Sequence, residues 1–504
     1  MENKIYVFGI GGTGSRVLKS LTMLLAAGVD CGVNTIVPII IDKDKSNGDY
    51  TKTSDIIDEY IAVNNEMSTN TSSANKNKFF KTKIKLLNSG LLLELKDNDQ
   101  CFENFLGLLS TENRALTEIL FSRETLDMDM KAGFRGNPNM GSVVLNQFDQ
   151  SPTFDDFAND FTSGDKIFII SSIFGGTGAS GFPLLRKILH EPRTDGKYAN
   201  WGIVNNAPLG AITILPYYKL ESGKINSSEW NDKTKAALHY YKSEDKGLDT
   251  LYYIGTNNRT TYFQSEDTVG GANQKDPAHI VEMAAAMAIL DFANPENDSD
   301  NIHRNGNNEI TKTNYKEFAI EDDSQSDFTM FCENTINLVT MPLSRFLLFS
   351  KYMGYHVIEE KKDTNRELIV KKIAKNIYES QGLRQNFANV KDREFNKISI
   401  KKLESIQKNF VEWLLEMEEQ DFKFSPFNLT TTNANDFIKG KIILFNETWK
   451  VKDWSSMDSK LNDLSDEMVK NKKDAIDIKQ KTSQIFLELF YRATGELLTL
   501  ISGK

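Results

Sequence analysis

Two glycine-rich stretches contain the residue types that could bind a phosphate group. The first, Gly9 to Ser15, matches G-x-G-x-x-G directly after a short apolar run. The second, Gly175 to Gly181, follows the apolar run Lys166 to Ser172. Small residues let backbone N–H groups approach an anion closely, and a helix N-terminus favours negative charge. Both stretches therefore predict phosphate binding, although the second could also be a tight strand-to-helix turn.

Other candidate residues lie in further loops. Asp42 and Asp44 follow the apolar run Thr35 to Ile41, at the strand end where α/β proteins place ligand contacts. A third set of turn residues, Gly133 to Gly141, contains Arg135, which could face a phosphate. The alternative for this third set is an ordinary loop with a solvated arginine, because turn residues mark loops before they mark sites.

These candidate loops lie between segments whose patterns predict strands and helices. Short apolar runs predict buried strands, and Pro38 suggests that one of them is an edge or bulged strand. Apolar residues at helical spacing follow the first glycine stretch, and Gly28 is a natural C-cap. We therefore expect an α/β fold, a Rossmann-type parallel sheet with helices on both faces. The expected strands are Lys4–Phe8, Thr35–Ile41, Lys166–Ser172, Leu209–Leu215 and Leu248–Ile254.

Composition excludes several classes of function. The formal charge of −10 and pI near 5.3 argue against a surface devoted to nucleic acid or anionic membrane. We expect neither a membrane span nor a secretory signal, since apolar runs are short and the chain begins with a strand. The three cysteines lie far apart in the sequence, which fits a reducing cytoplasm. Neither they nor the five scattered histidines have the spacing of metal ligands. We therefore predict a cytoplasmic protein with no metal held by its own side chains.

The order of these segments resembles the tubulin/FtsZ superfamily of GTPases, and within it the bacterial tubulin-like group. The resemblance covers about residues 1 to 295 and ends with the apolar stretch Ile280 to Phe292, which looks like the family's central helix. The segments that carry it are Gly11-Gly12-Thr13-Gly14-Ser15, Gly136-Asn137-Pro138 with Gly141, Gly175-Gly176-Thr177-Gly178, the strand ending at Pro216 with Glu221 beyond it, and Asn257.

This resemblance implies a tubulin-like fold, a GTP or GDP ligand and an accompanying Mg²⁺. It implies that Glu221 reaches the ribose and that Asn257 reaches the base. The loop with Arg135, Gly136 and Asn137 would reach toward the γ-phosphate. Two glycine loops at helix N-termini need few lysines, and the chain lacks the G-x-x-x-x-G-K-[ST] loop. The residues that would cradle the phosphates are Gly11, Gly12, Thr13, Gly14, Ser15, Gly175, Gly176, Thr177, Gly178, Ala179 and Ser180.

The resemblance also implies head-to-tail self-association and GTP hydrolysis at the contact between subunits. In the family, an acidic residue after the central helix completes the next subunit's site and activates the attacking water. Here the candidate is Asp291, with Asp298 and Asp300 as alternatives. Asp291 is so close to the helix that it could instead be a helix-end carboxylate. The chain after Asn308 has no clear match to the family's second sheet.

Two other functions fit parts of the sequence. The stretch Gly9 to Ser15 followed by Asp42-Lys43-Asp44 also resembles ThiF-type and ubiquitin-activating adenylating enzymes, or a dinucleotide-binding fold with Asp42 on the ribose. That hypothesis predicts ATP or NAD and leaves Gly175 to Gly181 unexplained. The third hypothesis is a nucleotide-gated scaffold without turnover that meets partner proteins through its C-terminal helices. The biological process, the filament geometry and the preference for guanine stay open.

The chain is long enough for two to four domains. We expect a nucleotide-binding domain over residues 1–278, with a polar insertion at about 46–80 and a helical insertion at about 81–130. After it we expect a central helix at 279–293, a second domain at 309–425 and a C-terminal helical region at 426–504. The C-terminal half is expected to be α+β or mostly helical.

Overall fold

The computed structural model divides into two compact units that interleave along the chain. The first contains residues 1–19, 31–54 and 84–318, and the second contains 20–30, 55–83 and 319–504. These units differ from the contiguous ranges expected from the sequence. The structure describes residues 3–43, 47–67, 79–95, 100–107, 110–130, 134, 137–193, 196–220, 227–243, 247–256, 260–262, 276–317, 326–357, 398–429, 437–439, 443–445, 455–470 and 482–500.

A central sheet forms the core of the first unit, with the strand order β3-β2-β1-β4-β5-β7-β9. The pairings that join β2, β1, β4, β5, β7 and β9 are all parallel. The chain fills one side of β1 first and then crosses to β4, so the order of the sheet reverses between β1 and β4. The strands are β1 (Lys4–Ile10), β2 (Thr35–Ile41), β3 (Lys83–Ile84), β4 (Lys166–Ser172), β5 (Leu209–Ile214), β7 (Thr250–Ile254) and β9 (Asn314–Glu317).

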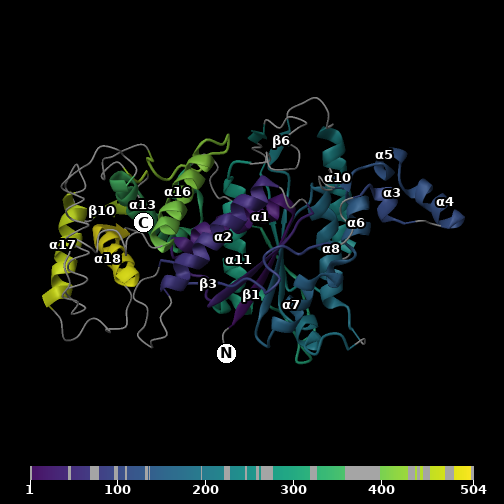
Figure 1. Cartoon of the computed structure of the whole chain (residues 1–504), viewed down its shortest axis with the longest axis horizontal. Helices are drawn as coiled ribbons and strands as arrows, with labels where there is room; N and C mark the ends of the chain where they lie inside the picture. The colour runs from purple at the N-terminus through teal and green to yellow at the C-terminus, as the bar shows by residue number, and fades with distance from the viewer. Residues whose placement is uncertain are drawn as a thin grey trace. The chain divides into compact units, whose positions relative to one another are not determined.

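Helices cover both faces of this sheet (Figure 1). Tyr6 pairs with Ile167 and Val7 with Phe168, so Tyr6 and Phe168 point to opposite faces. Tyr6 contacts Phe157 of α7 (Pro152–Asp160), whereas Phe168 contacts Phe292 of α11 (Ile280–Ala293). The predicted fold class, a Rossmann-type parallel sheet with helices on both faces, is confirmed.

Pro38 lies in an interior strand, contrary to the expected edge or bulge. It pairs with Val7 of β1 inside an unbroken register. On the other side of β2, Lys85 N–H donates to the Ile36 carbonyl and Ile40 N–H donates to the Leu91 carbonyl, so these contacts bracket position 38. A proline is tolerated in a strand where no neighbouring carbonyl needs its missing N–H as a donor. Strand β3 is only two residues long and does not extend alongside Pro38.

Residues 48–67 form a helix within the stretch where a polar insertion is expected, at about 46–80. This helix, α2 (Gly48–Met67), buries Ile56, Ile57, Tyr60 and Val63 along one side. Their spacing is helical, but polar residues surround them and mask the pattern. The Ser/Thr/Asn run over 68–78 lies outside the described residues.

The expected helical insertion at 81–130 is only partly helical. Residues 85–95 run beside β2 through Ile40 and Leu92 rather than forming a helix. Three short helices follow, named α3 (Phe102–Phe105), α4 (Thr111–Leu120) and α5 (Arg123–Leu126).

Helix α11 is buried on almost all sides, as its apolar sequence predicts. Every residue from Ile280 to Ala293 except Asp291 is buried. A capping box opens it: His279 accepts from the Val281 N–H, and Glu282 accepts from the His279 N–H. The predicted central helix at 279–293 is present.

Shorter elements complete the first unit. Strands β6 (Tyr218–Leu220) and β8 (Thr260–Tyr262) pair in parallel as a separate small sheet. Helices α9 (Trp201–Asn205) and α10 (Ser227–Ser243) precede and follow β5 and β6, and α12 (Asp298–Asn301) follows α11.

The second unit is mostly helical in the residues that the structure describes. Its core is aromatic: Phe349 contacts Phe79, Phe346 and Phe490. Trp413 is fully buried and donates to Ser20 Oγ at 3.1 Å. The elements are α13 (Glu333–Val357), α16 (Ile398–Glu418), α17 (Ser455–Lys470), α18 (Thr482–Leu497) and the antiparallel pair β10 (Ile443–Phe445) and β11 (Leu498–Leu500).

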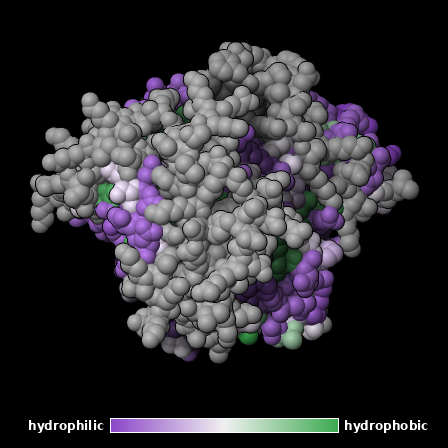
Figure 2. All heavy atoms as spheres, turned by 60° about the vertical axis from the view of Figure 1, so that its left-hand side comes forward, coloured by the Kyte–Doolittle hydropathy of each residue, from purple (hydrophilic) through white to green (hydrophobic). Residues whose placement is uncertain are grey.

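The described helices include none with the length and apolarity needed to cross a membrane. Figure 2 shows one face of the protein, on which the described side chains are mostly hydrophilic with small apolar spots between them.

Candidate functional site

Two glycine-rich helix N-termini meet where the order of the sheet reverses. Helix α1 (Gly11–Ala26) begins directly after β1, and α8 (Gly176–His190) begins four residues after β4. A Cβ placed on Gly11 would lie 3.5 Å from Thr177 Cβ and 4.0 Å from the Gly178 nitrogen. The two loops are therefore neighbours at the switch point, which is where open α/β sheets bind their ligands.

Glycine is required at specific positions in these loops. Gly11 has φ +72°, a backbone conformation that other residues rarely adopt. A Cβ at Gly14 would lie 2.4 Å from Gly9 C, and one at Gly178 would lie 2.5 Å from Ser172 O. Each glycine therefore lets a helix start close against the strand before it, so part of the pattern has a purely structural cause.

The N-terminal ends of α1 and α8 have a positive electrostatic potential and small side chains. Neither α1 nor α8 has an acidic residue in its first turn, and Gly175, the N-cap of α8, makes no side-chain capping bond. The first N–H groups of a helix have no partner within the helix, and the helix dipole favours an anion beside them. The pair of helix starts can hold a phosphate chain through backbone N–H groups.

The described part of the third predicted loop, Gly133 to Gly141, lies beside the second, Gly175 to Gly181. Asn137 caps α6 (Pro138–Leu145) by accepting from the Met140 N–H at 3.1 Å, and it donates to Thr125 Oγ1 at 3.2 Å. A Cβ on Gly141 would lie 2.3 Å from Ser180 Oγ, so α6 packs closely against the first turns of α8. Arg135 and Gly136 lie outside the described residues.

The remaining predicted ligand contacts are only partly described. Asp42 follows β2 directly and is buried. Asp44, Glu221 and Asn257 lie outside the described residues, so their predicted roles stay predictions.

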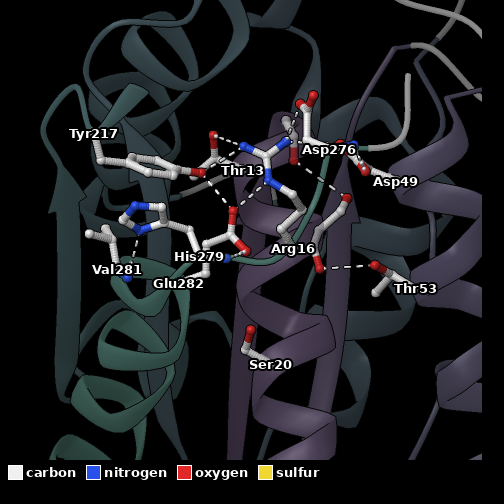
Figure 3. Close-up of polar contacts among 12 residues, drawn as sticks. Thr13, Arg16, Ser20, Asp49, Thr53, Tyr217, Asp276, His279, Val281 and Glu282 are labelled. Carbon is white, nitrogen blue, oxygen red and sulfur yellow. Dashed lines mark hydrogen bonds and ion pairs between the residues drawn. The ribbon is translucent and has the colours of Figure 1, made fainter. Parts of the chain in front are cut away.

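A buried ion network that the sequence analysis missed adjoins the first loop (Figure 3). Arg16, in the second turn of α1, is 2% exposed and contacts three carboxylates. The distances are 2.7 Å from Nε to Glu282, 2.8 Å to Asp49 and 3.0 Å to Asp276. One signal was available: Arg16 and Lys19 lie among the apolar residues of a buried helix, and a fully buried charge is rarely left unpaired.

Burial sets the protonation states in this network. Burial, helped by the charge of Asp276 and opposed by Arg16, raises the pKa of Asp49 to about 6. Burial, together with the charge of Arg16, lowers the pKa of His279 to about 3, so this histidine is neutral at physiological pH. Burial disfavours the charged form of Arg16, but Tyr217 and the carboxylates outweigh it and hold the pKa of Arg16 well above its usual value.

The three candidate acids lie in a different part of the first unit. Asp291 accepts from Tyr252 OH at 2.6 Å and Lys316 Nζ at 2.7 Å. Asp298 forms an ion pair with the buried Lys166, while Asp300 is exposed.

The acids are far from the glycine loops of their own chain. Asp291 is nine residues beyond Glu282 along α11, or about 14 Å at the rise of an α-helix. Lys166, the partner of Asp298, is the first residue of β4, whereas Gly175 follows the strand's other end, about 20 Å away. These acids cannot reach a ligand bound at the loops of the same chain.

Among the described residues, no group of three or more His, Cys, Asp and Glu side chains could hold a metal ion.

Comparisons with known proteins find few similarities. No protein-family model matches the sequence, and no curated protein does. Among solved structures, the chain is similar to CetZ2 from Haloferax volcanii in a GTPγS-bound protofilament, with 13% identity and a TM-score of 0.27. The aligned region covers 57% of this chain and spans 59% of that chain.

Proposed function

We propose that the protein binds the phosphates of a guanine nucleotide at the two glycine-rich helix starts, in the manner of the tubulin/FtsZ superfamily and its bacterial tubulin-like group. The observation that carries this proposal is the proximity of Gly11 to Thr177 and Gly178 at the switch point of the sheet. Two helix N-termini in contact supply N–H donors and dipoles to one anion. The preference for guanine rests on the order of the sequence segments.

The stretch Gly175 to Gly181 separates this proposal from its main alternative. An adenylating or dinucleotide-binding enzyme would use the first loop and the buried Asp42 after β2, which is a specific point in its favour. It would give the second loop no role. Mg²⁺ is expected to accompany a triphosphate, because it binds phosphate oxygens with only one or two protein carboxylates.

A ligand panel tests the choice of nucleotide. A ligand that binds only the folded protein raises its unfolding temperature in proportion to the logarithm of its concentration over Kd. We expect GTP and GDP with Mg²⁺ to stabilise the protein more than ATP or NAD at the same concentration. A larger shift with ATP or NAD would favour the adenylating or dinucleotide-binding enzyme.

We further propose that the protein self-associates head to tail and hydrolyses GTP at the contact. The distance between the loops and the acids supports this step, because Asp291, Asp298 or Asp300 could serve a nucleotide only in a neighbouring copy. A heterologous contact of this kind builds open filaments when its rotation does not close. Of the three acids, Asp300 is the exposed one, while Asp291 and Asp298 are held by lysines.

Mixing two defective variants tests whether the acid acts between copies. One variant carries Thr177→Glu, which repels phosphate, and the other carries Asp291→Asn, Asp298→Asn and Asp300→Asn together. At a GTP concentration well below the Kd of Thr177→Glu, each should be nearly inactive alone. In an equal mixture, about a quarter of random head-to-tail contacts would join an intact loop to an intact acid, so GTP hydrolysis should return to that fraction. A mixture as inactive as its components, beside an active wild type, would contradict hydrolysis between copies. A wild type that does not hydrolyse GTP would favour the nucleotide-gated scaffold.

A further inference from the structure

Arg16 uses every hydrogen-bond donor of its guanidinium inside the protein. An arginine has five N–H groups in a rigid fork. Nε donates to Glu282, NH1 donates to both Asp49 and Asp276, and NH2 donates to Thr13 Oγ1 at 3.4 Å and Tyr217 OH at 2.7 Å. Arg16 is thus held in place beside the first glycine loop and does not offer a donor to a phosphate.

The acceptors come from segments far apart in the sequence (Figure 3). Thr13 belongs to the glycine loop, Asp49 to the start of α2, Glu282 to the first turn of α11 and Tyr217 to the chain after β5. Further bonds join these partners to one another. Tyr217 OH donates to Glu282 at 2.7 Å, and Asp49 accepts from the N–H of Asp276 at 3.1 Å. Arg16 therefore connects the loop to the ends of two other helices.

The charges of this network do not balance. Arg16 and Lys19 of α1 face Asp49 of α2, together with Asp276 and Glu282 at the start of α11. With all of them ionised, these five described side chains have one negative charge in excess. Among the described residues, the other titratable groups that face it are His279, which is neutral, and the buried phenols of Tyr217 and Tyr218. Protonation of Asp49, whose pKa burial raises to about 6, would bring the cluster to neutrality.

This cluster is close enough to the loop to act on a bound anion. A Cβ on Gly12, the second residue of α1, would lie 3.7 Å from Arg16 NH1 and 3.9 Å from Asp49 Oδ2. A phosphate at the start of α1 would therefore lie within roughly 10 Å of Asp49. At that separation in a buried setting, one unit of charge changes affinity by about tenfold at an effective dielectric constant of about 20.

We propose that Arg16 is a positioning residue for the loop Gly11 to Ser15, and that the charge on Asp49 beside it controls how tightly this loop binds a polyphosphate. The proposal deepens the proposed function and rests on it for the presence of an anion at the loop. Ionised Asp49 repels the anion, so binding is tighter when Asp49 is protonated. The affinity should rise as the pH falls through about 6.

The test compares wild type with Asp49→Asn, because asparagine resembles the protonated acid in size and charge. Inorganic tripolyphosphate and GTP are titrated calorimetrically into the full chain at pH 5.0, 6.5 and 8.0. The ligands' own protonation changes the affinity of both proteins, so the ratio of their Kd values at each pH isolates the effect of position 49. We expect Asp49→Asn to bind about tenfold more tightly than wild type at pH 8.0 and with similar Kd at pH 5.0. Asp127→Asn, an exposed acid in a surface ion pair, makes the same change in net charge and should follow the wild-type pH profile.

A second variant tests the positioning role. Arg16→Lys keeps the charge but cannot make the five bonds, so tripolyphosphate affinity should fall about tenfold at every pH, while the pH dependence through Asp49 persists. Parallel profiles for wild type and Asp49→Asn, or weaker binding by Asp49→Asn at pH 8.0, would overturn the role of Asp49. Unchanged affinity in Arg16→Lys would overturn positioning by Arg16. Binding of tripolyphosphate without GTP would refute only the guanine-nucleotide function, whereas binding of neither would refute both proposals.

Discussion

The two glycine-rich helix starts differ in their charged surroundings, although they adjoin each other. The start of α1 lies beside Arg16 and three buried carboxylates. The start of α8 is uncharged: its first charged residue is Arg186, in the eleventh position of the helix. Within α8 itself, an anion therefore meets backbone dipoles and hydroxyl groups, whereas one at α1 also meets a titratable cluster. The comparison teaches that similar loop sequences can differ in how they respond to pH and to substitution.

The largest effect is expected from removing the cation of the α1 cluster. Arg16→Met would leave three buried carboxylates without their partner, and breaking a buried ion pair in this way costs about 3–5 kcal/mol of folding free energy. Urea unfolding at pH 7 measures the loss. The control is Arg123→Met, which removes an exposed arginine paired with Glu103 and Asp127 and should leave the unfolding midpoint nearly unchanged. Equal midpoints for the two variants would show that the network contributes little to stability.

A smaller effect is expected from steric substitution in the loops. Gly178→Ala would place a Cβ 2.5 Å from the Ser172 carbonyl oxygen, and the required backbone shift should cost about 2–3 kcal/mol. Gly12→Ala has ordinary contacts at 3.7 Å and longer. Alanine is also the better helix former, so its effect should stay within about 1 kcal/mol of wild type. Calorimetric or denaturant unfolding of both variants checks this, and equal destabilisation would contradict the close approach of α8 to β4.

The sequence predicted the sheet and the central helix because their patterns are local. Apolar strands followed by glycine turns and amphipathic or buried helices are visible within short windows. Helix α2 was missed because its four buried positions are diluted by polar residues. A sequence pattern reflects only neighbouring residues, whereas α2 is stabilised by packing against distant parts of the chain.

The ion network was missed for a related reason. The carboxylates that Arg16 contacts are 33 to 266 positions away along the chain, and no spacing rule joins such distant residues. In the sequence, only the family resemblance implied that Gly11 lies near Thr177. The structure explains this proximity, because the order of the sheet reverses between β1 and β4. The roles of Arg135, Glu221 and Asn257 stay predictions.

The pH dependence of stability should show the two titrating groups of the α1 cluster acting in opposite directions. His279 has a pKa of about 3 in the folded protein and about 6.5 when unfolded. The unfolded state therefore takes up a proton first, and stability falls as the pH drops from 6.5 toward 3. Between pH 6 and 4 this loss amounts to about 2–3 kcal/mol.

His279→Asn should remove this loss, since asparagine can still cap α11 but does not titrate. The opposing contribution of Asp49 then remains, so the stability of this variant should fall as the pH rises from about 4 to 6. Asp49→Asn should act in the opposite direction over the same pH range. The raised pKa of Asp49 means that its ionisation destabilises the fold as the pH rises from about 4 to 6, and the substitution removes that loss. Urea unfolding from pH 4 to 8 measures both. A stability difference between His279→Asn and wild type that stays constant from pH 4 to 6.5 would contradict the role of His279.

The smallest effect, and the most direct test of the α8 start, comes from Thr177→Glu compared with Thr177→Gln. Both variants add the same bulk beside Gly11, and only one adds charge. A carboxylate in the first turn should stabilise α8 by about 0.3–1 kcal/mol through the helix dipole. The same carboxylate should weaken tripolyphosphate binding about tenfold relative to glutamine, because it competes for the N–H groups that bind the anion. Structural damage would lower stability and affinity together. Higher stability with lower affinity would therefore identify the start of α8 as an anion site, and equal affinities for the two variants would exclude it.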